Sequence, residues 1–222
     1  MSSDTVLALK RQLDEYIGPI DGDDPRVLKR VGILDAATAL FAAQGYRKTS
    51  MGEVAKAAGV AKGTVYLYFE KKIDLLVAAC SREKLALWSD IEEVFDDSLP
   101  ARERLRKLCL VSLLSANRMP MTTRVFRGED IQAIFAELPP ALISADAFHR
   151  ETLMLPLLRE VAVEHPWTES ELKDRVNVIA GLGLFAEAIV NEEVLSGLSP
   201  QRYAEVLTDL LVDGLESKGK SR

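Results

Sequence analysis

The stretch TSMGEVAKAAGVAKGTVYLYFEKK, residues 49–72, constrains the fold more than any other part of the chain. Ser50 and Glu53 have the spacing of a capping box, in which the serine hydroxyl accepts from the Glu53 amide and the glutamate accepts from the Ser50 amide. Gly59 suits the left-handed conformation that ends a helix, and a second helical pattern follows at 62–69. Two short helices joined by a tight turn with glycine form a helix-turn-helix unit, whose second helix enters the major groove of DNA.

About a fifth of the chain, from Val31 to Leu76, resembles the DNA-binding domain of the TetR family of bacterial transcriptional regulators. The residues that carry this resemblance stand at fixed spacing and are Ile33-Leu34-Asp35-Ala36-Ala37, Leu40-Phe41, Gly45-Tyr46, Thr49-Ser50, Val54-Ala55, Ala58-Gly59-Val60, Lys62-Gly63-Thr64-Val65-Tyr66, Tyr68-Phe69, Lys72 and Leu75-Leu76. The resemblance implies an N-terminal three-helix DNA-binding domain. It also implies a larger helical C-terminal domain that binds an effector and dimerises.

Two positions depart from the family's pattern. Ala61 and Lys71 stand where the family often has serines that cap the recognition helix and the helix after it. Loss of such a cap typically costs about 0.5–2 kcal/mol of stability. We therefore expect two weaker helix ends in an otherwise intact domain.

The second helix of the motif carries side chains suited to reading DNA. Lys62 and Thr64 lie in its first turn, where side chains of a helix-turn-helix reach the base edges. Lysine can donate to guanine O6 and N7, and threonine can hydrogen-bond or contact a thymine methyl group. Gly63 lets the backbone approach the groove because it has no side chain. In the TetR family the matching positions commonly contact operator DNA, which implies that role here for Lys62, Gly63, Thr64, Tyr66 and Lys72.

Further hydroxyl groups and a lysine suit the phosphates that flank the bases. The hydroxyls of Tyr66 and Tyr68 and the ammonium of Lys72 can donate to phosphate oxygens, although Tyr68 fits a core position equally well. Thr49 and Ser50 stand at the start of a helix, where backbone amides favour an anion. The complete predicted DNA-binding set is Thr49, Ser50, Lys62, Gly63, Thr64, Tyr66, Tyr68 and Lys72.

Charge is divided unevenly along the chain. The net charge is −6, yet residues 26–72 hold nine lysine and arginine residues against three acidic ones, a local charge of +6. Residues 73–222 hold 17 basic and 25 acidic residues, a charge of −8. The basic part coincides with the helix-turn-helix, which is the electrostatic pattern of a DNA-binding protein.

The remaining sequence favours helices throughout, so we predict an all-α protein. The expected organisation is an N-terminal extension at 1–25, a DNA-binding domain at 26–71, an effector-binding and dimerisation domain at 72–217 and a tail at 218–222.

Two helices outside the motif follow from apolar periodicity. Residues 5–17 predict an amphipathic helix. The extension is either a helix docked on its own domain, a partly disordered tail or an arm that contacts DNA. A second helix, from Lys72 to Phe95, is expected to connect the two domains.

Apolar stripes in the C-terminal half suggest two further surfaces. In the family the last two helices usually form the dimer interface, and the stripes that match are Val178, Leu182, Phe185 and Ile189, with Tyr203, Val206, Leu207 and Leu210. A monomer core explains the same stripes. Candidate walls of an effector pocket are Trp88, Met121, Phe126, Phe135, Phe148 and Met154, although such residues also form ordinary cores.

Together with the patterns above, the resemblance to the TetR family implies a cytoplasmic homodimer that binds double-stranded DNA at a palindromic operator. We expect a repressor released by a small apolar or amphipathic effector; a DNA-binding architectural or cell-cycle factor without an inducer is the alternative. No motif of a nucleophile, metal site or phosphate-binding loop supports an enzyme, so we expect no catalysis, metal or cofactor. No apolar run approaches the length of about 20 residues needed to span a membrane.

Overall fold

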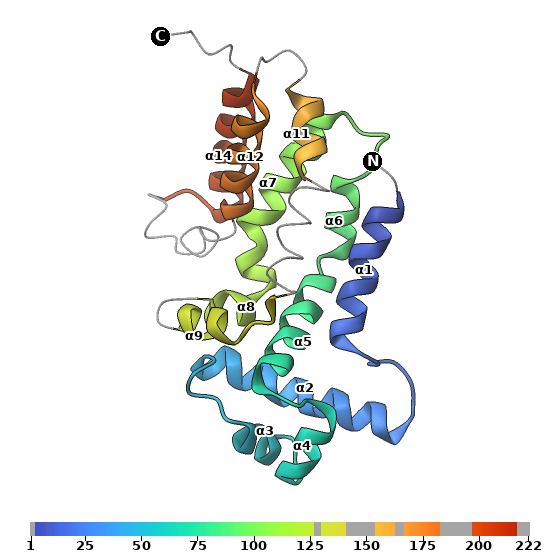
Figure 1. The fold of residues 1–222 in the computed structure, drawn as a ribbon. Coiled ribbons are helices and arrows are strands. Elements are labelled where there is room, and N and C mark those ends of the chain that lie inside the picture. Colours follow the sequence, from blue (N-terminus) through green and yellow to red (C-terminus); the bar gives the residue numbers. More distant parts are fainter. Residues whose placement is uncertain (1–2, 127–129, 141–153, 163–166, 183–196, 217–222) are drawn as a thin grey trace. The chain divides into compact units, whose positions relative to one another are not determined.

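The computed structural model describes residues 3–126, 130–140, 154–162, 167–182 and 197–216. Within these ranges the regular elements are all helices, which confirms the predicted all-α fold (Figure 1). None of these helices is both long enough and apolar enough to cross a bilayer. The helices are α1 (Ser3–Ile17), α2 (Pro25–Gln44), α3 (Met51–Ala57), α4 (Lys62–Tyr68), α5 (Lys72–Leu85), α6 (Trp88–Val94), α7 (Ala101–Arg118), α8 (Pro120–Val125), α9 (Asp130–Glu137), α11 (Leu155–Val161), α12 (Glu169–Ala180) and α14 (Pro200–Glu216).

The chain separates into two compact units. We call Ala8–Leu87 with Met119–Pro140 the head unit, and Met1–Leu7 with Trp88–Arg118 and Ala141–Arg222 the body unit. The head unit therefore contains the helix-turn-helix together with α5, α8 and α9. The functional boundary between residues 71 and 72 stays a prediction.

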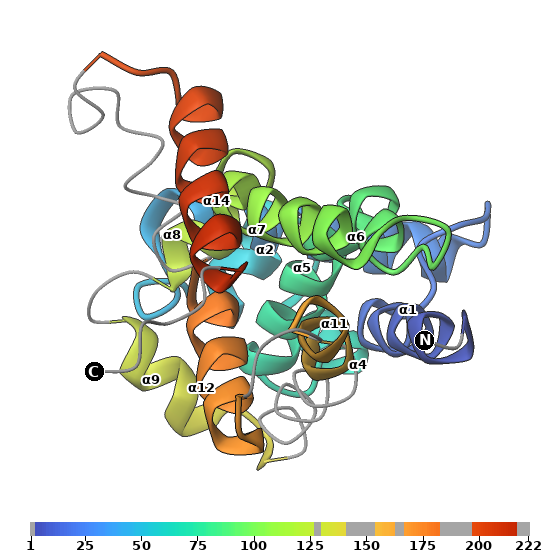
Figure 2. The same cartoon turned by 90° about the horizontal axis from the view of Figure 1, so that it is seen from above.

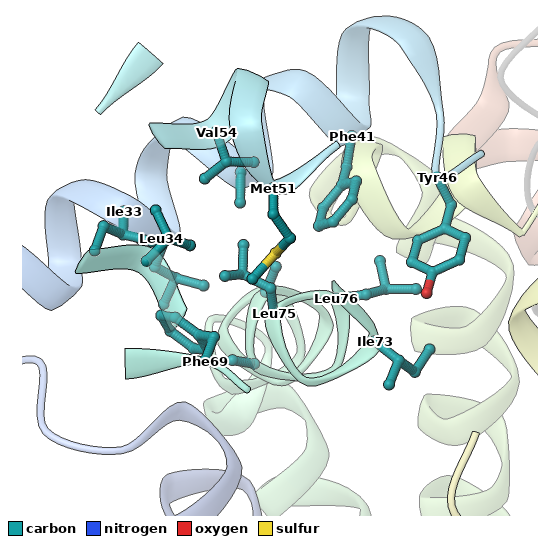
Figure 3. Packing of buried hydrophobic residues seen from close by; sticks show 14 of the residues in the cluster. Ile33, Leu34, Phe41, Tyr46, Met51, Val54, Phe69, Ile73, Leu75 and Leu76 are labelled. Atoms are coloured by element: carbon teal, nitrogen blue, oxygen red, sulfur yellow. The ribbon is translucent and has the colours of Figure 1, made fainter. Parts of the chain in front are cut away.

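The head unit is built around α2. Asp24 caps this helix by accepting from the Arg26 amide, and Pro25 occupies its first turn, where no amide donor is needed. The buried side chains of α2 pack with those of α3, α4 and α5, and with residues from α8 and α9, in one hydrophobic core (Figure 3). The members of this core that are fully enclosed include Ile33, Leu34, Phe41, Tyr46, Leu75, Leu76 and Met121.

The body unit is built around α7, against which α6, α11 and α14 pack, and Figure 2 shows α7 and α14 side by side. Leu105, Cys109 and Leu113 supply the buried face of α7. Arg104 is also buried, and it forms ion pairs with Asp97 and Glu160. These two carboxylates compensate a charge that would otherwise be costly to bury.

The predicted continuous helix from Lys72 to Phe95 is wrong. It is divided into α5, which ends at Leu85, and α6, which begins at Trp88. The adjacent residues Leu87 and Trp88 are both buried, but they belong to different units. The chain therefore turns where the periodicity alone indicates continuation.

The two cysteines lie in different units, where Cys109 is buried and Cys80 is half-buried. Cys109 lies in the core of the body unit, and Cys80 packs against the core of the head unit. Burial raises the pKa of both thiols to about 12. Both therefore remain protonated at neutral pH and behave as small hydrophobic side chains.

Gly45 is required where α2 ends. Its φ of 83° and ψ of 176° lie in a region that is essentially restricted to glycine. A Cβ atom at this position would also lie 2.4 Å from Asp130 Oδ2. The turn between α2 and α3 thus depends on the absence of a side chain.

We expect Gly45→Ala to lower the free energy of unfolding by about 2 kcal/mol or more, because it adds backbone strain and a clash. Gly32→Ala is the matched control, since Gly32 is helical and has open space around it. That control should be neutral or stabilising by about 0.5–1 kcal/mol. Thermal and urea unfolding measure both changes, and equal stability of the two variants would contradict the strain argument.

Candidate nucleic-acid interface

The first helix of the motif begins with the predicted capping box. Ser50 Oγ accepts from the Glu53 amide at 3.2 Å, and the Glu53 carboxylate accepts from the Ser50 amide at 2.9 Å. Hydrogen bonds from Ser50 lower the pKa of Glu53. This confirms the sequence prediction and fixes the start of α3.

A glycine turn then directs the chain into α4. Gly59 has a φ of 67°, and the Val60 amide donates to the Ala55 carbonyl at 3.0 Å. Val65 and Phe69 are buried in the head core and hold α4 in place. In Figure 1, α3 and α4 lie together at the lower edge of the head unit.

The two helix ends without serine caps differ from each other. Ala61 precedes α4 and supplies no side-chain hydrogen bond. At the start of α5, the Asp74 carboxylate accepts from the Lys71 amide at 2.8 Å. The expected weakness is therefore present at α4, whereas Asp74 compensates part of it at α5.

The outer face of α4 consists of residues that the head core leaves exposed. Lys62, Gly63 and Tyr66 are exposed, as the predicted role in DNA binding requires, and Thr64 is half-buried. Leu67 is 84% exposed, the largest exposed fraction among the large hydrophobic side chains in the described part of the chain. Leu67 is not among the residues predicted from the sequence to bind DNA, although its place between Tyr66 and Tyr68 on a two-turn helix was a usable signal.

Gly63 has no internal explanation. A Cβ atom there would meet nothing within 4 Å, and the residue lies inside a helix, where glycine is unfavourable by about 0.5–1 kcal/mol relative to alanine. The free protein would therefore accept a larger side chain. A requirement for glycine would have to come from a surface that approaches α4 from outside.

The turn residue Tyr46 joins the motif to α9. Its amide donates to Asp130 Oδ2 at 2.9 Å, and its hydroxyl donates to Glu137 Oε2 at 2.6 Å. Burial and the nearby Glu137 carboxylate raise the pKa of Tyr46. Sequence reasoning missed both acidic residues, because their partner lies more than 80 residues away along the chain.

Lys72 is also tied to Tyr46. Its Nζ donates to the Tyr46 carbonyl at 3.0 Å and lies 4.0 Å from the centroid of the tyrosine ring. Burial lowers the pKa of Lys72, while Glu137 and Asp130 act in the opposite direction. An ammonium group has three N–H donors, so one bond to Tyr46 leaves Lys72 able to bind a phosphate.

The other predicted phosphate contacts have different surroundings. Thr49 is buried, and its hydroxyl donates to the Gly45 carbonyl at 2.8 Å. Its side chain therefore holds the turn and is not available to a phosphate in this structure. Ser50 is exposed at the start of α3, and Tyr68 is half-buried.

The sequence around the helix-turn-helix matches a known protein family. Residues 33–79 match the family model described as bacterial regulatory proteins, tetR family. This part of the chain is a DNA-binding domain of the TetR family. This is a family of transcriptional regulators, not of enzymes.

Individual relatives of this chain are similar over shorter stretches. The fatty acid metabolism regulator protein of Bacillus subtilis (strain 168) is 36% identical over 77 residues, which are 35% of this chain and 40% of the relative. The HTH-type transcriptional repressor KstR of Rhodococcus jostii (strain RHA1) is 49% identical over 55 residues, 25% of this chain and 26% of the relative. The chain thus spans less than half the length of these two relatives.

A solved structure extends the similarity to most of the fold. The crystal structure of a TetR-like transcriptional regulator from Rhodococcus sp. RHA1 has a TM-score of 0.59 and 25% sequence identity. It covers 88% of this chain and 100% of the solved chain.

The predicted effector-pocket residues belong to different units. Met121 and Phe126 pack in the head core, whereas Met154 packs against the body core. Phe135 is 52% exposed on α9. Trp88 lies in the body unit, at a groove of about 580 Å³ that it forms with Phe95 and neighbouring residues. Phe148 lies outside the described residues, so the pocket itself stays a prediction.

The predicted dimer residues also have mixed surroundings. Val178 and Leu210 are 64% and 67% exposed, and Leu182 is buried. Tyr203, Val206 and Leu207 are half-buried on α14. Phe185 and Ile189 lie outside the described residues.

Among the described histidine, cysteine, aspartate and glutamate residues, no group of three could hold a metal ion.

We expect Gly63→Ala to change stability and DNA binding in opposite directions. The added methyl group should stabilise the free protein by up to about 1 kcal/mol, because it improves helix propensity in open space. On the outer face of α4 it should weaken DNA binding by about tenfold, equivalent to about 1.4 kcal/mol. Thermal unfolding and fluorescence anisotropy with labelled DNA measure the two effects. Unchanged DNA affinity would show that Gly63 does not face the groove.

Proposed function

We propose that this protein is a dimeric repressor that binds a palindromic operator and is released by a small apolar or amphipathic effector. One observation carries the DNA-binding part: the outer face of α4 is exposed and has no internal structural explanation at Gly63 or Leu67. Repression in the cytoplasm would follow from occupation of the operator. The named repressor and the fatty acid metabolism regulator among its relatives support the sign of regulation and the apolar effector.

Each exposed group on α4 has a role in this proposal. Lys62 donates to guanine, Thr64 contacts a neighbouring base, and Leu67 packs against a thymine methyl group. Tyr66, Tyr68, Lys72 and Ser50 hold the phosphates. Thr49 acts indirectly, because its buried hydroxyl holds the turn that leads into α3.

Release by an effector requires a mechanical link to the head unit, and α8 and α9 are suited to supply it. Asp130 and Glu137 hold Tyr46, while Glu83 of α5 accepts from the amides of Met121 and Thr122 at 3.0 and 2.8 Å. Both ends of the segment 119–140 continue into the body unit. An effector that prefers one arrangement of this segment would shift the equilibrium between DNA-binding states.

The DNA-binding proposal is tested by selecting bound fragments from random duplex DNA at moderate salt. We expect the wild type to enrich a palindrome and Lys62→Ala/Tyr66→Ala to lose it. Lys62→Ala alone should relax base preference by about 1–3 kcal/mol. Lys56→Ala is the matched control, because Lys56 is an exposed lysine of α3. Enrichment that is indifferent to the α4 substitutions would overturn the proposed reading face.

The dimer proposal predicts that an acidic residue on the exposed apolar face of α12 or α14 separates the protomers. We expect Val178→Glu and Leu210→Glu to shift the sedimenting species from dimer to monomer, because each would place a charge in an apolar contact. Leu28→Glu is the control, since Leu28 is an exposed leucine of the head unit. A dimer that survives both changes would place the interface elsewhere.

A further inference from the structure

The N-terminal extension ends in a contact with the DNA-binding motif. Leu9, Leu13 and Ile17 form the buried face of α1, and Ile17 belongs to the head core. The helix stops at Gly18, which has a φ of 68° and donates its amide to the Asp14 carbonyl at 2.8 Å. The predicted amphipathic helix therefore exists, and its end is part of the head unit.

Arg30 of α2 connects this end to the recognition helix. Its Nη2 and Nε donate to the Ile17 carbonyl at 2.7 and 3.1 Å, and its Nη1 donates to the Tyr68 carbonyl at 3.1 Å. The guanidinium carbon lies 4.2 Å from the centroid of the Phe69 ring, in a cation–π contact. One side chain thus holds the last residue of α1 and the last residue of α4.

The carbonyls of Ile17 and Tyr68 both stand at a helix end and need a hydrogen-bond donor from outside their helix. The last four carbonyl groups of a helix lack partners within that helix, and a cation near them is favoured by the helix dipole. The planar guanidinium can donate in several fixed directions, which a lysine ammonium cannot reproduce. This contact matters most for α4, because that helix has only seven residues and no side-chain cap at Ala61.

We propose that α1 is a working part of the DNA-binding unit, and that Arg30 is a positioning residue through which α1 fixes the C-terminal end of the recognition helix. This inference rests on the proposed DNA-binding function. It replaces the alternative in which the extension contacts DNA itself: residues 1–24 hold six acidic and two basic side chains, a composition that phosphates repel. Removing the hydrogen bonds of Arg30 to α1 and α4 should weaken the recognition of bases, although no residue that touches DNA would be lost.

Gly18 allows the contact to be broken without changing any charge. A Cβ atom on Gly18 would lie 2.8 Å from Arg30 Nη2, and alanine is also strained at this φ. We therefore expect Gly18→Ala to lower operator affinity by about three- to tenfold, with unchanged affinity for random DNA and an unchanged salt dependence. Gly22→Ala is the matched control, because Gly22 also has a positive φ of 119° but nothing lies within 4 Å of its added Cβ.

A second variant acts on the other side of the same contact. Arg30→Lys keeps the charge but loses the forked donation, so it should share the effect of Gly18→Ala. The double variant should lose no more affinity than either single variant, since both changes remove one interaction. Additive losses, equal losses on operator and random DNA, or a smaller salt dependence for Arg30→Lys would overturn the proposal; the last result would identify Arg30 as a phosphate contact.

Amide hydrogen exchange in the absence of DNA tests the contact independently of the proposed function. The Phe69 amide donates to the Val65 carbonyl at 3.0 Å and reports on the last turn of α4. We expect this amide to exchange faster in Gly18→Ala and Arg30→Lys, and to exchange at the wild-type rate in Gly22→Ala. Unchanged exchange in the first two variants would show that α1 does not hold α4, whatever DNA the protein binds.

Discussion

Burial of Tyr46 is the constraint on which the rest of the head unit depends. A buried residue needs partners for its amide, carbonyl and side-chain polar groups. Asp130 and Glu137 accept from the amide and the hydroxyl of Tyr46, and Lys72 donates to its carbonyl. The carbonyl also accepts from the Thr49 amide at 3.2 Å, so loss of Asp130 or Glu137, rather than of Lys72, would leave a buried polar group of Tyr46 unsatisfied, at a cost of about 1–3 kcal/mol. The turn that leads into the helix-turn-helix is thus fixed by helices remote from it in sequence.

The same constraint links the DNA-facing surface to the interior. Lys72 is a proposed phosphate contact and also a partner of Tyr46, and the carboxylates of Asp130 and Glu137 act on its pKa. The negative charges of Asp130 and Glu137 would oppose the binding of a phosphate to Lys72, while the fixed turn holds the Lys72 ammonium in place. Any rearrangement of α9 would therefore change both the geometry and the electrostatics of the DNA-binding surface. The proposed effector would therefore not need to reach α4 to affect it.

The parts of this structure that the sequence predicts are those decided by neighbours within a few residues. The capping box of Ser50 and Glu53, the left-handed Gly59 and the uncapped start of α4 at Ala61 all depend on local spacing. The unpredicted parts depend on long-range packing. The α9 carboxylates contact Tyr46 only in the folded chain. Thr49 is buried by the folded head unit, although its hydroxyl donates to the Gly45 carbonyl only four residues away. The break between α5 and α6, at Ala86 and Leu87, is likewise not indicated by the apolar periodicity.

Residues without an internal explanation are the most informative about function. Thr49 and Arg30 satisfy the protein's own backbone groups, so their presence is accounted for by folding. Gly63 and Leu67 are different: the glycine lies in open space within a helix, and the leucine is an apolar side chain exposed to water. Both choices are unfavourable for the free protein, and both become favourable when a surface covers α4. A DNA groove would supply close backbone approach at Gly63 and thymine methyl groups for Leu67, so these two residues support the proposed recognition of DNA by α4 more strongly than the positive charge alone.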